Sequence, residues 1–408
     1  MEKILPLQGV RVLDFTRVLA GPNATLVLGT MGAEVIKIEH PIGGDKYRLY
    51  PPFVGGKSLP FFFLNKNKKS MTLNLKSEKG REIALKLVER CDVLVENFRP
   101  GVMVKLGLGY EDVSKVNPKI IYCSFASFAH QGPYANRPGF DLTASAEGGL
   151  MTLAGSPAGS RPQRAGFAAA DQICGYFAAM AIMAALLARE KTGKGQKIEV
   201  SLLRTIIDLM GWPITLYWFD KGEFIRSIGQ DFVPLEDLLI TVTRPSGVYK
   251  CADGRWVAVV IDPEQIEIKG PKHWPFEIDK KILNNPLFDT PEKRVQRQKE
   301  METIMSDIFK DKRSDEVIKE LISAGIACGL VRTIEDIASN PWQMREFWVD
   351  IYDPDAGNIR TMALPWWLSE SDEQRLPAPS LGQHTAEVLK ELGYNEEEIE
   401  ELRKEGVI

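Results

Sequence analysis

Residues 10–39 read VRVLDFTRVLAGPNATLVLGTMGAEVIKIE and decide the fold class. VRVLDF (residues 10–15) and EVIKIE (residues 34–39) are short apolar segments of strand length, and a helical segment lies between them at about residues 22–31. Two such strands joined by a helix pair in parallel through a right-handed crossover. The stretch therefore predicts the first βαβ unit of an α/β domain.

The same alternation continues through the first 130 residues. It predicts further strands at MTLNLK (residues 71–76), DVLVEN (92–97) and KIIYCSF (119–125), with a helix at residues 78–90. The fold class is therefore α/β, with a Rossmann-like large domain built on a parallel sheet.

Ligands of such sheets bind at the carboxyl ends of the strands. The first of these ends carries a single Gly21-Pro22 pair where a dinucleotide fold has G-x-G-x-x-G, so NAD binding is disfavoured. A helix N-terminus there could receive a phosphate through backbone N–H groups, although a structural turn is the commoner meaning of a Gly-Pro pair.

Asp171 is the sole carboxylate of residues 164–189, RAGFAAADQICGYFAAMAIMAALLAR. An unpaired buried carboxylate is costly, so this residue needs a role. Capping a helix that begins at Gln172 is the commoner explanation, and nucleophilic catalysis is the alternative. The apolar run 173–188 is short for a membrane span and follows an acid closely, so we expect a buried core helix.

A basic run, KNKK at residues 66–69, is followed by Lys76, Lys79 and Arg81. The default expectation is a solvated helix face. A site for a phosphate-bearing ligand is the alternative, because the run lies near the predicted strand ends.

The second half of the chain predicts a smaller α+β domain. SGVYKCADGRWVAVVI (residues 246–261) is a hairpin pattern, followed by helices at 293–309 and 314–324 and a strand at 326–333. A second hairpin is expected at 347–365, then a helix at 385–392 and another capped by Asn395 with Glu398. The domain limits that follow are 1–225, 228–331 and a C-terminal segment, 335–408, returning to the large domain.

Composition bounds the partners and the compartment. The 408 residues carry a net charge of −4, so no field of one sign indicates a nucleic-acid or membrane partner. The five cysteines are scattered without C-x-x-C spacing, which predicts neither disulfides nor a zinc site and fits a cytoplasmic protein. No export signal is visible at the N-terminus.

In this order the segments resemble the family III CoA transferases, the CaiB/BaiF group that includes formyl-CoA and carnitine CoA-transferases. The resemblance covers nearly the whole chain and is weakest in the middle domain. It rests on LQGVRVLDFTRVLAGP, GAEVIKIEHPIGGD, NKNKKSMTLNLKSEKG, DVLVENFRPGVMVKLGL, RPGFDLTASAEGG, the Asp171 stretch, TGKGQKIEVSL and LGQHTAEVLKELGY.

The resemblance implies that Asp171 is the nucleophile of a CoA transferase, supported by Asp141, Phe140 and Gly166. It implies an interlocked homodimer that takes an acyl-CoA thioester and a carboxylic acid as substrates, with no permanently bound cofactor or metal. The positions that would contact CoA are Val18, Leu19, Ala20, His40, Leu73, Lys76, Asn97, Phe98, Lys105 and Arg137. Because an unperturbed aspartate has a pKa of about 3.9, Asp171 would be ionised at pH 7 without a general base.

Three alternatives remain open at this point. An α-methylacyl-CoA racemase needs an acid–base partner, but the position of its histidine is occupied by Phe140. A non-catalytic CoA-binding protein and a nucleotide-dependent dehydrogenase are the others. A medium-sized or aromatic acid substrate is suggested by four aromatic residues, Trp212, Tyr217, Trp218 and Phe232, although core packing is commoner for such residues. The glycine-rich loop of formyl-CoA transferases has no counterpart, so formyl-CoA is an unexpected substrate.

Overall fold

The computed structural model describes residues 4–153, 161–220, 245–261, 273–339 and 347–408. The chain divides into two compact units. The larger comprises Met1–Leu150, Ala165–Met210 and Arg345–Ile408, and the smaller comprises Met151–Arg164 and Gly211–Met344. The domain limit expected between residues 225 and 228 lies outside the described residues.

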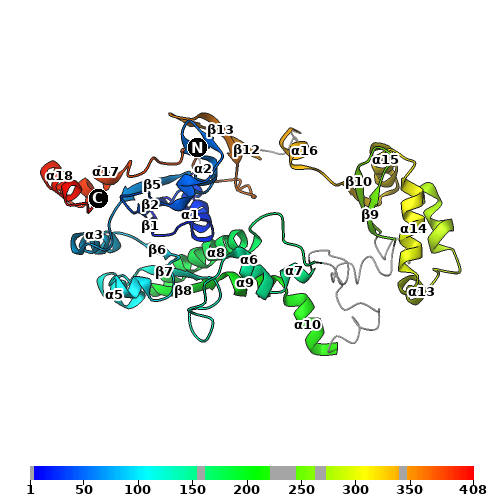
Figure 1. Cartoon of the computed structure of the whole chain (residues 1–408), viewed down its shortest axis with the longest axis horizontal. Helices are drawn as coiled ribbons and strands as arrows, with labels where there is room; N and C mark the ends of the chain where they lie inside the picture. The colour runs from blue at the N-terminus through cyan, green and yellow to red at the C-terminus, as the bar shows by residue number, and fades with distance from the viewer. Residues whose placement is uncertain (1–3, 154–160, 221–244, 262–272, 340–346) are drawn as a thin grey trace. The chain divides into compact units, whose positions relative to one another are not determined.

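A six-stranded sheet forms the centre of the larger unit, and every neighbouring pair of its strands is parallel (Figure 1). The predicted α/β class with a parallel sheet is confirmed. In spatial order the strands are β5 (Lys68–Thr72), β2 (Glu34–Glu39), β1 (Arg11–Asp14), β6 (Val93–Glu96), β7 (Ile121–Ala126) and β8 (Gln196–Ser201).

The strand expected at residues 71–76 is shifted in the structure to β5, Lys68–Thr72. The N–H of Leu73 still donates to Glu39 of β2, but the N–H of Asn74 donates to the carbonyl of Val407. The chain therefore leaves the sheet after residue 73 to meet the C-terminal segment. The first residues of β5, Lys68 and Lys69, are polar, so a search for apolar runs places the strand too late in the sequence.

Helices cover both faces of the sheet (Figure 1). One face packs against α1 (Ala20–Thr30) and α8 (Ala169–Thr192), with α6 (Asp141–Glu147) and α9 (Leu202–Leu209) against α8. On the other face, alternate strand residues such as Leu13, Ile36 and Leu94 form a core with four helices that are longer than one turn. These are α3 (Glu78–Glu89), α5 (Tyr110–Val116), α17 (Thr385–Glu391) and α18 (Glu396–Lys404).

The contact between α1 and α8 is close because Gly175 faces the start of α1. A Cβ at Gly175 would lie 2.7 Å from the carbonyl oxygen of Ala20 and 2.7 Å from Nδ2 of Asn23. That same Nδ2 donates to the carbonyl of Gln172 over 2.9 Å. The start of α8 is therefore fixed against the helix that follows β1.

Helix α8 begins at Ala169 with Ala168 as its N-cap, and Asp171 lies inside the first turn. The expectation that Asp171 caps a helix beginning at Gln172 is therefore wrong. The expected core helix is buried on one face only, since Met180 and Leu187 are exposed. Among the described residues, α8 alone has the length and apolar composition of a membrane span, and its packing against α1 is that of a core helix.

Smaller elements complete the larger unit. The expected hairpin is present as β12 (Trp348–Asp353) and β13 (Gly357–Met362), and Asn395 forms the expected capping box with Glu398. The others are β3 (Phe53–Val54), β4 (Lys57–Ser58), α2 (Leu59–Asn65), α4 (Val102–Lys105) and a 3₁₀ turn at Lys46–Leu49.

The smaller unit contains an antiparallel sheet of β9 (Gly247–Lys250), β10 (Trp256–Val260) and β11 (Ala327–Leu330). The first two strands are the expected hairpin, turning at Gly254, whose φ is +79°. A core of its own joins this sheet to helices α14 (Gln298–Phe309) and α15 (Ser314–Ala324). Its other described helices include α10 (Gly211–Asp220), α13 (Pro291–Gln296) and α16 (Ile334–Ser339). Helix α7 (Leu150–Leu153) starts with the last residue of the first segment of the larger unit and continues into the smaller unit.

Candidate active site

The candidate site begins at the carboxyl end of β1, where residues 16–18 form a turn before α1. Asn97, which follows β6, pairs with this turn through both ends of its amide. Its Oδ1 accepts the N–H of Arg17 over 2.9 Å and its Nδ2 donates to the carbonyl of Arg17 over 2.7 Å. The guanidinium of Arg17 also lies over the ring of Phe98, 4.8 Å from its centroid. The structure thus brings Val18, Asn97 and Phe98 together.

Val18 has a φ of +69°, in the left-handed region that β-branched residues avoid. Such strain persists only where surrounding contacts determine the conformation, and it is common at ligand sites. Here the N–H of Val18 faces the carboxylate of Asp45, with both oxygens 3.2 Å from the nitrogen.

Asp45 belongs to a cluster of buried charges beneath the turn. Its Oδ2 lies 3.0 Å from Nζ of Lys37, which also donates to the carbonyl of Thr16 over 2.7 Å. Asp14 pairs with Lys68 over 3.3 Å and accepts both the N–H and the hydroxyl of Thr16. The side chains in both ion pairs are completely buried.

The expectation of a solvated helix face is wrong at residues 66–69, because Lys68 belongs to this buried cluster. Lys68 opens strand β5, and its Nζ also donates to Pro22, Thr25 and Asn65. Burial lowers the pKa of Lys68 to about 8, against the opposing charge of Asp14. Lys66 is buried too and donates to the carbonyl of Met362 over 2.6 Å. The helix-face expectation fails for residues 66–69, because Lys68 starts a strand and its acidic partner is distant in sequence, but it holds for Lys79, which is exposed on α3.

Asp171 lies on the first turn of α8, next to a second carboxylate. Its backbone N–H donates to Oδ1 of Asp141, the first residue of α6, over 3.2 Å. Burial, reinforced by the charge of Asp141, raises the pKa of Asp171 to about 7. The expectation that Asp171 keeps an unperturbed pKa and is wholly ionised at pH 7 is therefore wrong.

The charge of Asp171 also affects two further residues that the sequence did not indicate. Burial and the charge of Asp171 raise the pKa of Tyr47, which lies on the 3₁₀ turn after β2. Burial also raises the pKa of Cys174, one helical turn beyond, to about 12. No sequence signal marks Tyr47, because its electrostatic relation to Asp171 joins residues more than a hundred positions apart.

The remaining predicted supporting residues are exposed. Phe140 is the N-cap of α6 with 74% of its surface accessible. Gly166 precedes α8 and has open space where a Cβ would lie.

Four of the other predicted CoA positions follow neighbouring strands or lie at the start of α1. Leu19 and Ala20 begin α1, and the imidazole of His40, after β2, bonds locally with Ile42 over 3.1 Å. Leu73 is buried in the core beside β2, and its side chain is enclosed by apolar neighbours.

The predicted cationic contacts are further out on the surface. Lys76 and Lys105 are exposed, after β5 and at the end of α4. Arg137 pairs with Glu147 and stacks over Phe128, 4.8 Å from the ring centroid. The structure therefore gathers the turn, Asn97 and Phe98 closely, but not these three cations.

The sequence also did not indicate Glu96, a buried carboxylate at the carboxyl edge of the sheet. Glu96, the last residue of β6, accepts the N–H of Phe98 over 2.9 Å and the hydroxyl of Ser124. His130 in turn contacts Ser124 Oγ at 3.2 Å. Burial raises the pKa of Glu96 to about 7. An acid at the end of an apolar strand is the one signal that could have indicated it.

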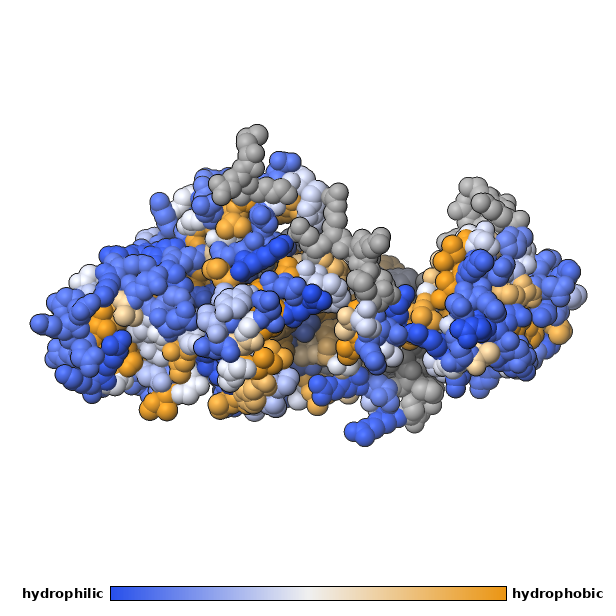
Figure 2. Space-filling view, turned by 90° about the horizontal axis from the view of Figure 1, so that it is seen from above, coloured by the Kyte–Doolittle hydropathy of each residue, from blue (hydrophilic) through white to orange (hydrophobic). Residues whose placement is uncertain are grey.

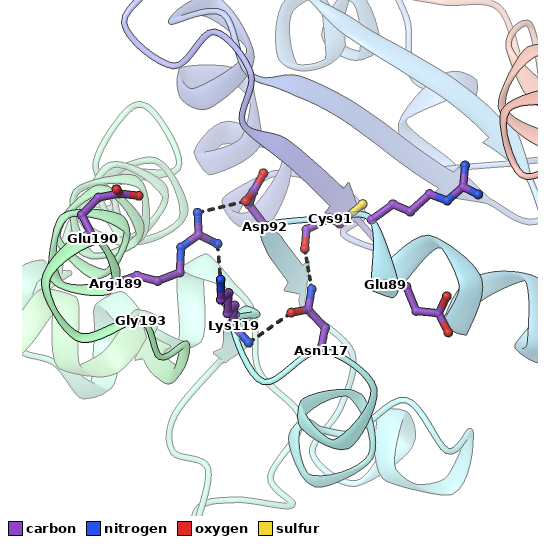
Figure 3. A pocket seen from close by; sticks show the side chains of 9 residues that line it. Glu89, Cys91, Asp92, Asn117, Lys119, Arg189, Glu190 and Gly193 are labelled. Carbon is purple, nitrogen blue, oxygen red and sulfur yellow. Dashed lines mark hydrogen bonds and ion pairs between the residues drawn. The ribbon is translucent and has the colours of Figure 1, made fainter.

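A polar cavity of about 470 Å³ lies at the opposite, amino edge of the sheet (Figure 3). Two of its charges pair with each other: Arg189 donates to Asp92 over 2.9 Å, and it also donates to the carbonyl of Lys119 over 3.3 Å. Asn117 donates to the carbonyl of Cys91 over 2.8 Å. Because ligands of parallel sheets bind at the carboxyl ends of the strands, this cavity is not the candidate site.

A family model described as CoA-transferase family III matches residues 7–385. The chain belongs to CoA-transferase family III. It is 38% identical over 420 aligned positions to the succinyl-CoA:glutarate CoA-transferase of Mus musculus, covering 100% of this chain and 91% of the relative. It is 32% identical to the formyl-CoA:oxalate CoA-transferase of Streptomyces avermitilis, covering 98% of this chain and 99% of the relative.

Solved structures agree with this membership. A CAIB/BAIF family protein from Brucella suis superposes with a TM-score of 0.79 at 28% identity, covering 96% of this chain and 100% of that one. The protein is thus a CoA-transferase, an enzyme that uses CoA thioesters as substrates. The recognition of the family from its sequence motifs is confirmed.

Proposed function

We propose that this CoA-transferase moves CoA from an acyl-CoA to a free carboxylic acid through covalent intermediates on Asp171. The supporting observation is the position of Asp171: it is partly buried, lies beside Asp141, and is carried by a helix fixed against the start of α1. A carboxylate with a raised pKa is a stronger nucleophile once it is ionised.

The proposed reaction begins when a carboxylate oxygen of Asp171 attacks the thioester carbon and the C–S bond breaks. This gives an acyl-aspartyl anhydride and a CoA thiolate. The thiolate attacks the γ-carbonyl carbon of Asp171, the donor acid leaves, and an aspartyl-CoA thioester remains. The acceptor carboxylate displaces CoA to form a second anhydride, whose acyl carbon the thiolate attacks, which releases the new acyl-CoA and Asp171.

CoA is proposed to lie along the carboxyl edge of β5, β2, β1 and β6. The turn at Val18–Ala20, together with Asn97 and Phe98, is the part of the predicted set that is already assembled. His40 and Leu73 lie at the ends of the neighbouring strands, while Lys76, Lys105 and Arg137 would reach the phosphates from the surface. Gly166 leaves open space before α8 for the reacting carbonyl, where a backbone N–H could hold an oxyanion.

The acids are proposed to be short dicarboxylates. The relatives' names pair CoA donors with glutarate, oxalate and L-malate. The earlier suggestion of a medium-sized or aromatic acid has less support, since Trp212, Tyr217 and Trp218 are exposed in this chain and Phe232 lies outside the described residues.

A homodimer is proposed as the working form. Four apolar side chains of α8 and α9 are exposed, namely Met180, Leu187, Ile207 and Leu209, and apolar groups interrupt the hydrophilic surface of the larger unit (Figure 2). Such surface marks an interaction site in a soluble protein. All five cysteines are free thiols, which fits a reducing compartment such as the cytoplasm.

The mechanism is tested by intact-protein mass spectrometry after mixing with succinyl-CoA, acetyl-CoA or formyl-CoA, with and without hydroxylamine. Wild-type protein should gain an acyl or CoA adduct on the peptide that contains Asp171. Asp171→Ala should gain none, while Asp311→Ala, which changes an exposed aspartate of the smaller unit, should label normally. An unlabelled wild-type protein that exchanges an α-proton with deuterated solvent would instead support a racemase.

A further inference from the structure

We propose that Asp45, paired with Lys37, is a positioning residue that fixes both the CoA-binding turn and the segment carrying Tyr47. The proposal rests on the proposed function. It concerns residues that do not touch substrate themselves but determine the geometry of those that do.

The backbone of the turn is held at five successive polar groups. Asp14 accepts the N–H of Thr16, and Lys37 donates to the carbonyl of Thr16. Asn97 bonds to both the N–H and the carbonyl of Arg17, and Asp45 accepts the N–H of Val18. Three of the five bonds come from charged side chains that are inaccessible to solvent or nearly so. The turn is therefore preorganised before CoA arrives.

The bond from Val18 is the one that acts on the strained residue. A valine at a φ of +69° is unfavourable, so its surroundings must compensate. Both carboxylate oxygens of Asp45 lie 3.2 Å from the Val18 nitrogen, and a charged acceptor strengthens such a bond. Without this carboxylate, we expect Val18 to relax toward negative φ and turn its neighbours out of position.

The same carboxylate organises the segment that carries Tyr47. Asp45 precedes the 3₁₀ turn and its Oδ1 accepts the N–H of Tyr47 over 3.1 Å. The N–H of Asp45 donates to Glu39 over 3.0 Å, and Glu39 holds Arg48 through two bonds of 2.7 and 2.8 Å. One buried carboxylate thus connects the turn at Val18 to the segment that carries Tyr47 through hydrogen bonds to both backbones.

Stability alone is a poor explanation for the pair. Burying two charges costs much of what their attraction returns, and well-packed apolar residues often replace such pairs without loss. What an apolar pair cannot supply is the direction of the bonds to the carbonyl of Thr16 and the N–H groups of Val18 and Tyr47. We therefore assign the pair a geometric role.

The larger unit contains a matched control for this arrangement. Asp353 is also buried, pairs with Lys57 over 2.8 Å, and accepts the backbone N–H groups of Asp355 and Ala356. Its chemistry is that of Asp45, but it holds the turn of the β12–β13 hairpin. A substitution there should lower stability without altering the site.

The test compares kcat, the KM for succinyl-CoA, the Kd of CoA and the melting temperature for Asp45→Ala, Asp45→Asn and Asp353→Ala. Asp45→Ala should raise the KM and the Kd at least tenfold, and Asp45→Asn should recover part of the loss because its Oδ1 still accepts an N–H. Asp353→Ala should leave both constants within about twofold. Equal constants in folded Asp45→Ala, or an equal rise in Asp353→Ala, would overturn the proposal.

A double-mutant cycle keeps the proposal testable if Asp45→Ala folds poorly. Glycine adopts positive φ without strain, so Val18→Gly should reduce the effect of Asp45→Asn on the Kd of CoA. Additive effects would contradict the positioning role. Labelling of Asp171 by succinyl-CoA separates the two proposals: if wild-type protein is not labelled, the proposed function fails, while the Kd of CoA still reports on the turn.

Discussion

The backbone N–H of Asp171 donates to a carboxylate oxygen of Asp141 over 3.2 Å, so that two acids from different helices share one partly desolvated space. Only one of these residues, Asp171, lies on the helix that packs against the start of α1. Asp141 therefore acts on Asp171 electrostatically, by raising its pKa.

Labelling of Asp171 by an acyl-CoA should depend on pH. Because the pKa of Asp171 is raised to about 7, the population of its carboxylate form, the proposed nucleophile, grows as the pH rises from 6 to 8. The initial rate of adduct formation should follow this rise, measured by quenched-flow mass spectrometry. Asp141→Asn removes one of the two causes of the raised pKa, so the midpoint should move to lower pH. An unchanged midpoint would show that burial alone sets it.

Asp171→Asn should stabilise the fold at pH 8. A carboxyl whose pKa is raised in the folded state contributes stability below its unfolded pKa, and this contribution is lost as the pH rises through about 7. The neutral amide avoids that loss, so its melting temperature should exceed that of wild type by about 1–3 °C at pH 8. At pH 5 the difference should shrink, because Asp171 is then mostly protonated. Scanning calorimetry at the two pH values checks this.

The buried pair of Asp14 and Lys68 gives a prediction about stability. Lys68→Met leaves the carboxylate of Asp14 without its ion-pair partner in a fully buried position, which should cost about 3–5 kcal/mol of the free energy of unfolding. Asp14→Asn together with Lys68→Met should recover much of this loss. Urea denaturation followed by circular dichroism measures both variants. If the double variant is as unstable as Lys68→Met alone, the loss comes from packing and not from the charge.

The fold was largely predictable because its signals are local. The pattern of residues 10–39 specifies β1, α1 and β2 by apolar runs alone, and the turn residues Asp253 and Gly254 specify the β9–β10 hairpin. The family motifs further identified Asp171, Asn97 and Phe98 as candidates, and the structure places the last two against the same turn.

What could not be predicted depends on contacts between distant residues. Lys68 looks solvent-exposed in KNKK because its partner, Asp14, lies 54 residues away. The raised pKa of Asp171 depends on Asp141, thirty residues earlier, and on burial that no local pattern reports. The helix start at Ala169 was missed because a run of small residues resembles a loop until packing against α1 fixes it.

Gly175→Ala should impair catalysis and stability together, because it separates α1 from α8. The added methyl group would lie 2.7 Å from the carbonyl of Ala20 and from Asn23, a distance that no side-chain rotation relieves at the backbone oxygen. Overpacking of this kind costs about 1–3 kcal/mol. Since the shift carries Asp171 away from the turn at Val18, kcat for CoA transfer should fall more than tenfold even where the variant remains folded.

Gly211→Ala, a helical position with open space around it, is the matched control and should leave kcat unchanged. A folded Gly175→Ala variant with wild-type kcat would mean that the spacing between the two helices does not determine the geometry of the reaction.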